Sequence, residues 1–216
     1  MIFARHLAHI IGVLLLSGCA GGASPPAWQA NAQLGMRNFE QAYLTGNARV
    51  AEAEFVRARS EIAATGQADL VARAELVRCA VRTASLEFDD CPAFVALYPD
   101  AAAQSRAYAA YIAGRWEGLD ANLLPAQHRA VIAGGPLSAL EDPLARLVAA
   151  GASLRAGKLA PQAIPAAVEA ASLNGWRRPL LAWLGVQAKR AEAAGDAEAL
   201  EQVRRRMDLV SGTPGR

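Results

Sequence analysis

The sequence predicts an all-α protein built from antiparallel helical hairpins. Apolar residues recur at helical spacing, glycines end these stretches at short intervals, and no run of strand length alternates apolar and polar residues. Hydrophobic residues make up 53% of the chain and aromatic residues only 6%, so the apolar content is mostly alanine, leucine and valine. Small apolar side chains of this kind favour closely packed helices.

The first two patterned helices are expected on either side of Gly66. From residue 48 onward, one apolar stripe recurs at steps of three and four residues: Ala51, Phe55, Ala58 and Ile62. Residues 70–81 are apolar on two sides, as in a helix packed between neighbours. The stretch "EFDDCPAF" then breaks the pattern. Asp89 or Asp90 is expected to cap the next helix, with Pro92 in its first turn.

The second half of the chain contains further helices. Residues 100–113 are helical by propensity, whereas residues 114–136 are rich in turn formers and poorly defined. Asp142 and Pro143 predict the cap and first turn of a helix that ends near Gly157. A short helix is expected up to Gly175, another up to Gly195, and a last one after Asp196, with this apolar face: Leu200, Val203, Met207 and Val210.

Helices joined by short glycine turns are typical of hairpin repeats. In "GNARVAEAEFVRA", the spacing of Ala51, Phe55 and Ala58 after the turn resembles the second half of a tetratricopeptide repeat. The first half departs from that family pattern, because Phe39 lies where a small residue should allow close helix approach and Gly35 where a bulky one is usual. No clean period of about 34 residues emerges. A short tetratricopeptide-like solenoid and an irregular helical bundle both remain open.

The N-terminus predicts an export signal. Arg5 precedes an apolar run from Ile10 to Leu16, which is shorter than the roughly 20 residues of a bilayer-spanning helix. The end of this run, Leu16-Ser17-Gly18-Cys19, resembles the lipobox of bacterial lipoproteins. The resemblance implies cleavage between Gly18 and Cys19 and acylation of Cys19, and two or three acyl chains anchor a protein stably. The alternatives are an ordinary signal peptide with a fortuitous cysteine, or a buried apolar helix.

The lipoprotein resemblance also implies a location and a domain plan. Ala20 follows the cysteine where inner-membrane lipoproteins often carry aspartate, which implies the outer membrane. We therefore expect four segments: a signal peptide (1–18), a flexible tether (19–30), a helical domain (31–210) and a disordered tail (211–216). About 180 residues are enough for one domain with its own core.

The two remaining cysteines, Cys79 and Cys91, form an even pair in an oxidising compartment and predict a disulfide. A metal site is not expected, since only His128 remains as an imidazole after the signal is removed. The acidic residues Glu87, Asp89 and Asp90 could touch a cation, but helix capping explains them without one.

Composition gives no support for nucleic-acid binding. Removal of the signal takes away Arg5, leaving 21 Lys and Arg against 20 Asp and Glu. We expect no cofactor and no catalytic residue, because the sequence contains no nucleophile motif, phosphate-binding loop or zinc motif. The lone His128 is expected at the surface or at a helix cap.

The sequence therefore predicts a lipid-anchored periplasmic adaptor that binds another envelope protein and has no catalytic activity. Candidate partner-binding residues are Trp116, Trp176 and the run Arg204, Arg205 and Arg206, with core packing or a solvated face as the alternative for each. Trp183 is expected in the core. A second hypothesis is a peptidoglycan-acting or glycan-binding lipoprotein that uses Glu117 and Asp120 beside Trp116.

Overall fold

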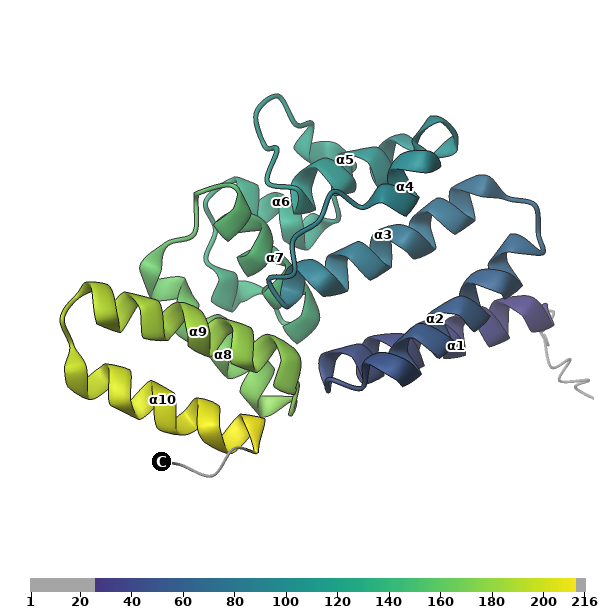
Figure 1. The fold of residues 1–216 in the computed structure, drawn as a ribbon. Coiled ribbons are helices and arrows are strands. Elements are labelled where there is room, and N and C mark those ends of the chain that lie inside the picture. The colour runs from purple at the N-terminus through teal and green to yellow at the C-terminus, as the bar shows by residue number, and fades with distance from the viewer. Residues whose placement is uncertain (1–25, 213–216) are drawn as a thin grey trace, which may run out of the picture.

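The computed structural model describes residues 26–212. Ten α-helices and four short 3-10 helices make up this part of the chain, which contains no strand (Figure 1). The predicted all-α class is therefore confirmed. None of the helices in residues 26–212 combines the length and apolar character needed to span a bilayer.

The N-terminal hairpin consists of α1 (Ala27–Leu44) and α2 (Ala48–Ala63). Gly35 is the point of close approach, because a Cβ atom there would lie 2.9 Å from the Cβ of Ala58. Phe39, one turn later, packs its ring 5.1 Å from that of Phe55. The small and bulky residues of the first helix are thus exchanged relative to the tetratricopeptide pattern, and the two helices still pack closely.

Helix α3 (Ala68–Ala84) lies at the centre of the fold and packs on α7 (Pro143–Arg155). Gly151 allows this contact, because a Cβ atom there would lie 2.2 Å from the carbonyl oxygen of Thr83. As predicted from the cap and proline, α7 begins at Asp142, whose carboxylate accepts a hydrogen bond from the amide of Ala145. The two-sided apolar pattern of residues 70–81 is explained by this central position.

The middle of the chain is irregular and covers one side of α3 (Figure 1). Its helices are short because prolines and glycines interrupt the sequence every few residues. They are α4 (Pro92–Ala96), η1 (Tyr98–Asp100), α5 (Ala103–Ile112), η2 (Ala121–Leu123), α6 (Ala126–Ile132) and η3 (Leu137–Ala139).

The C-terminal part contains η4 (Pro161–Ala163), α8 (Ile164–Leu173), α9 (Arg177–Ala193) and α10 (Ala197–Ser211). Helices α9 and α10 form a second hairpin, and Asp196 caps α10 as predicted. Trp183 is fully buried, and its indole N–H donates to the carbonyl of Ala84 at the end of α3. This bond ties the C-terminal helices to the central helix, in agreement with the core position expected for Trp183.

Three local expectations differ from the structure. Helix α1 begins at Ala27, inside the segment expected to be a tether, because Trp28 and Ala32 already pack along its buried side. Helix α10 continues to Ser211, one residue into the expected tail. Cys91, rather than Asp89 or Asp90, occupies the N-cap position of α4, without a side-chain capping bond, and Asp89 accepts a hydrogen bond from the amide of Cys91.

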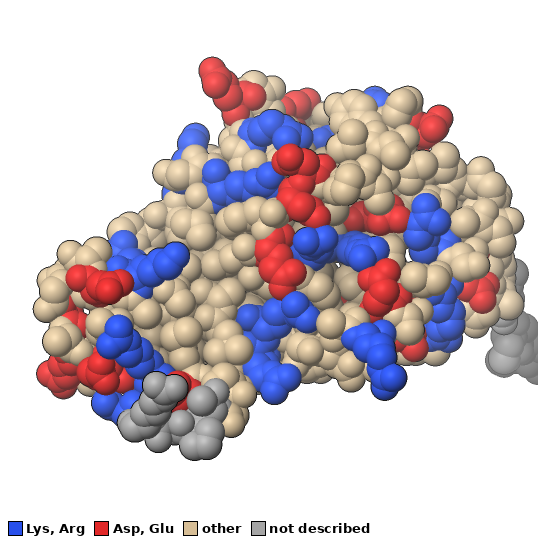
Figure 2. Space-filling view, viewed as in Figure 1, with Lys and Arg blue, Asp and Glu red and all other residues tan. Residues whose placement is uncertain are grey.

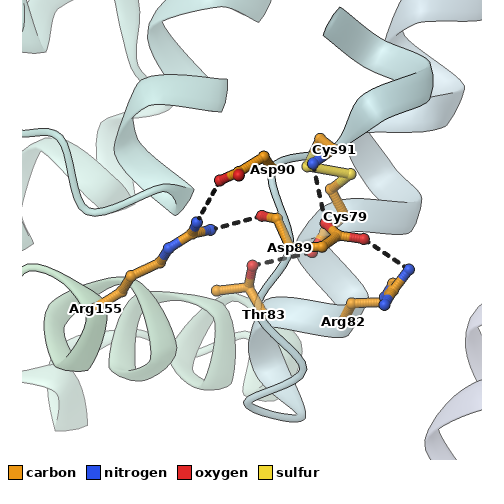
Figure 3. The surroundings of a disulfide bond; sticks show 7 residues. All are labelled: Cys79, Arg82, Thr83, Asp89, Asp90, Cys91 and Arg155. Atoms are coloured by element: carbon orange, nitrogen blue, oxygen red, sulfur yellow. Dashed lines mark hydrogen bonds and ion pairs between the residues drawn. A yellow bond between two sulfur atoms is a disulfide. The ribbon is translucent and has the colours of Figure 1, made fainter.

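The loop at residues 85–91 connects the parts of the fold. Cys79 in α3 and Cys91 form the predicted disulfide, with their Cα atoms 5.9 Å apart (Figure 3). Around it, Arg82 pairs with Asp89, and Arg155 in α7 contacts both the carboxylate of Asp90 and the carbonyl of Asp89. The loop is thus fixed to α3 and α7 by a covalent bond and by charged hydrogen bonds.

Glu87 extends these contacts to both hairpins. Its carboxylate accepts hydrogen bonds from the hydroxyl of Tyr43 in α1 at 2.7 Å and from Arg178 in α9 at 2.8 Å. Burial acts to raise the pKa of Glu87, but the bonds from Tyr43 and Arg178 and the charge of Arg82 together hold that pKa below its usual value. The carboxylate is therefore the common partner of the first and last hairpins.

Candidate functional site: a groove along the central helix

The main hollow of the molecule is a groove that follows one side of α3. Its floor consists of residues spaced three and four apart, Leu70, Arg73 and Val77. Helix α1 forms one wall, and α5 with the segment 122–125 forms the other. A helix that packs its opposite side on α2 and α7 thus leaves a third side open.

Three adjoining hollows make up this groove. The first, between α1 and α3, measures about 390 Å³, and the second, between α3 and α5, about 560 Å³. A third of about 210 Å³ lies where the groove reaches the start of α7. Val77 lines all three, and Arg73 lines the first two, so the hollows form one continuous surface.

The groove combines apolar surface with unpaired charge. Trp28, Met36 and Leu70 line the part between α1 and α3. Arg73 is exposed, and the ion pairs of the described residues do not include it. Such a surface can hold a helix or an extended segment through apolar contacts and hydrogen bonds.

His128 lies at the end of this groove and corrects the expectation of a surface or capping position. Its side chain is buried, with Nδ1 3.2 Å from the hydroxyl of Tyr111 and its ring 5.4 Å from that of Tyr108. Burial lowers the pKa of His128 to about 4, against a smaller opposing effect of Asp142. The imidazole is therefore neutral at neutral pH.

The residues of the glycan hypothesis do not converge on one hollow. Trp116 is half-buried, stacks on Tyr111 at 5.4 Å and donates its N–H to the carbonyl of that tyrosine. It borders a hollow of about 430 Å³ whose lining includes Lys158 but neither Glu117 nor Asp120. Glu117 is exposed, and Asp120 caps η2 by accepting from the amide of Asn122.

The other predicted partner-binding residues lie away from the groove. Trp176 is half-buried and packs where the N-terminal hairpin meets α9. Arg204, Arg205 and Arg206 are exposed on α10, and Arg204 pairs with Glu201. Trp176 thus packs between hairpins, while Arg206 also lines a separate hollow of about 470 Å³ between α8 and the α9–α10 hairpin.

The two disulfide cysteines lie close to the carboxylate of Asp89. The sulfur atoms of Cys79 and Cys91 and a carboxylate oxygen of Asp89 lie within 4.8 Å of one another. Because the two sulfurs are bonded to each other, neither is a thiolate that could hold a metal ion. Gly18 and Cys19 lie outside the described residues.

Sequence reasoning did not identify the groove residues Glu40, Arg73, Val77 and Tyr108. One signal was available, because residues 70–81 are apolar on two sides and Val77 belongs to one of those stripes. The walls come from helices that are distant in sequence, so the groove itself was not predictable. No family model, curated protein or solved structure matches this chain.

Proposed function

We propose that the protein is a lipid-anchored adaptor of the bacterial outer membrane whose groove along α3 binds a segment of another envelope protein. The observation that carries the proposal is the continuous groove that has Val77 at its centre. Helical hairpin proteins use grooves of this kind to bind helices or extended peptides. Trp28 and Met36 supply the apolar anchors that such interfaces favour.

The lipid on Cys19 would act by tethering. Only six residues separate Cys19 from Pro26, and the groove begins at Trp28 in the first turn of α1. The anchor therefore keeps the groove close to the membrane surface. Confinement of both partners to one membrane raises their effective concentration without any additional contact.

Site-specific photo-crosslinking in intact envelopes tests this proposal. The full-length lipoprotein would carry a benzoylphenylalanine at position 73 in the groove or at position 56 on α2, where Val56 is 55% exposed. We expect one discrete protein adduct from position 73 and none from position 56. Adducts from neither position, or equal adducts from both, would contradict a partner in the groove.

Two matched variants test the same point by affinity. Arg73→Glu should reduce partner capture at least tenfold, whereas Arg49→Glu makes the same charge change on an exposed position outside the groove and should leave it unchanged. Cys19→Ser, which cannot be acylated, should lose capture in envelopes but retain crosslinking in concentrated solution. Capture of only lipid or murein would contradict the adaptor function.

A further inference from the structure

The small cavity at the end of the groove brings together titratable side chains from four parts of the chain. Glu40 comes from α1, Tyr108 from α5, His128 from α6 and Asp142 from the cap of α7. Gln127 and several apolar side chains complete the wall: Val77, Ala80, Val81, Leu144, Ala145 and Val148. The cavity therefore has an apolar side and a polar side that carries two carboxyl groups.

The two carboxyl groups have no cationic partner. None of the ion pairs of residues 26–212 involves Glu40 or Asp142. Burial and, second to it, the charge of Asp142 raise the pKa of Glu40, with a smaller opposing effect of Arg37. Glu40 is half-buried, whereas Asp142 is exposed and one of its carboxylate oxygens accepts the amide of Ala145. Two like charges that line one hollow are stabilised by a cation placed between them.

His128 adds a hydrogen-bonding atom to the same cavity. The residue is 2% exposed, and its Nδ1 is occupied by the hydroxyl of Tyr111, so Nε2 is the nitrogen left for a ligand. His128 lines the hollow, so Nε2 is the ring nitrogen with which a ligand in it could form a hydrogen bond.

The chemistry of the cavity favours an organic cation over a metal ion. Its volume of about 210 Å³ is far above the ~15 Å³ that one water molecule needs. The donor atoms of Glu40, His128 and Asp142 do not form one of the close ligand groups found in residues 26–212. A cation at the end of an aliphatic stem matches both sides of the cavity, because the stem packs on Val77 and Leu144.

We propose that this cavity binds a lysine or arginine side chain of the partner segment that occupies the groove. The inference rests on the proposed function and adds the chemistry of the partner. The charged head would lie between the carboxylates of Glu40 and Asp142 and against the ring of Tyr108. A neutral imidazole does not repel this cation, and binding selects the tautomer in which Nδ1–H donates to Tyr111 and Nε2 accepts.

The probe for this site is n-butylguanidinium chloride, with n-butylammonium chloride as the lysine analogue and butyramide as the neutral control. The full-length protein in detergent would be titrated while the imidazole ¹⁵N signals are recorded by NMR. Two of the three histidines, His6 and His9, lie in the predicted signal peptide, and His128→Gln identifies the signal of interest by its loss. We expect both cations, and not butyramide, to shift the His128 Nε2 signal in a saturable way.

Matched variants make the test specific. Glu40→Gln with Asp142→Asn removes both charges but keeps the helix cap, because asparagine caps as well as aspartate. This double variant should bind the cations at least tenfold more weakly, provided that its melting curve shows a folded protein. Glu141→Gln, on the exposed residue next to Asp142, should bind them as the wild type does.

Each other outcome overturns either this inference or the proposed function on which it rests. If the wild type and the double variant bind the cations with equal affinity, or if butyramide binds equally well, the carboxylates do not bind the cation. A shift caused by N,N′-diacetylchitobiose and not by the cations means a glycan site. An adduct from position 73 without cation binding leaves the adaptor standing and removes this inference. Cation binding without any adduct leaves the cavity standing and removes the adaptor.

Discussion

The two sides of α3 differ in whether their charged residues form ion pairs. On one side, Glu75, Arg78 and Arg82 are each paired with a charge from α2 or from the loop at 85–91. On the other, Arg73 and Val77 face the groove, and Arg73 has no ion-pair partner in the described chain. The paired side thus connects α3 to its neighbours, whereas the groove side keeps a charged group that a binding partner could contact.

Figure 2 shows acidic and basic side chains next to one another on the outer surface over α2 and α3. Exposed ion pairs of this kind contribute little individually. Their number between separate helices nevertheless fixes the orientation of the N-terminal hairpin, which forms one wall of the groove. The paired side therefore positions the surface that binds.

The largest effect on stability should come from Trp183, which is hydrogen-bonded to the last residue of α3. Trp183→Ala removes a fully buried side chain and leaves the Ala84 carbonyl without its donor, so we expect a loss of about 3–5 kcal/mol in unfolding free energy. Trp183→Phe keeps most of the packing and should lose less than half as much. Urea denaturation measures both, and equal losses would contradict the packing argument.

Removal of the disulfide tests how much the paired side of α3 contributes to stability. Replacing Cys79 and Cys91 with serine opens a loop whose ends are 12 residues apart, and we expect the unfolding free energy to fall by about 3 kcal/mol. Reduced wild-type protein should unfold at the same urea concentration as the variant. An unchanged midpoint in both would show that the ion pairs around Asp89 hold the loop by themselves.

His128 tests the groove side through pH. Its folded pKa of about 4 lies below its ordinary value of 6.5, so the unfolded chain takes up a proton first as the pH falls. This contribution to stability is complete above pH 6.5 and is lost between pH 6.5 and 4, with a total of about 3 kcal/mol. Glu40, with its raised pKa, acts in the opposite direction.

The variant His128→Gln isolates the histidine from Glu40. The stability of the wild type, measured by urea denaturation from pH 7.5 to 4, should fall more steeply than that of the variant. Parallel curves would mean that His128 is accessible to protons in the folded protein, contrary to its burial.

The helices were predictable where one residue type decides the outcome. Three features could be predicted from the sequence because each depends on residues that are close together in it: the cap at Asp142, the cap at Asp196 and the apolar stripe of α2. The start of α1 was not, since the prolines before it suggested a tether and only the packing of Trp28 shows a helix.

The groove and its cavity depend on long-range packing. Glu40 in α1 and Asp142 before α7 are separated in the sequence by five other helices, α2 to α6, yet they line one cavity. His128 carries no local sign of burial, because its aromatic neighbours Tyr108 and Tyr111 come from another helix. The disulfide was predictable because cysteine pairing needs only compartment and parity.

The smallest effect compares two arginines on opposite sides of α3. Arg78 pairs with Glu52 and lies 4.6 Å from the ring centroid of Phe55, so Arg78→Gln should lower the unfolding free energy by less than about 1 kcal/mol, and less at high salt. Arg73→Gln makes the same substitution on the groove side and should leave stability unchanged while it weakens partner capture. Because the two variants have the same net charge, a difference between them reports position alone. If Arg73→Gln lowered stability and Arg78→Gln lowered capture, the assignment of the two sides would be reversed.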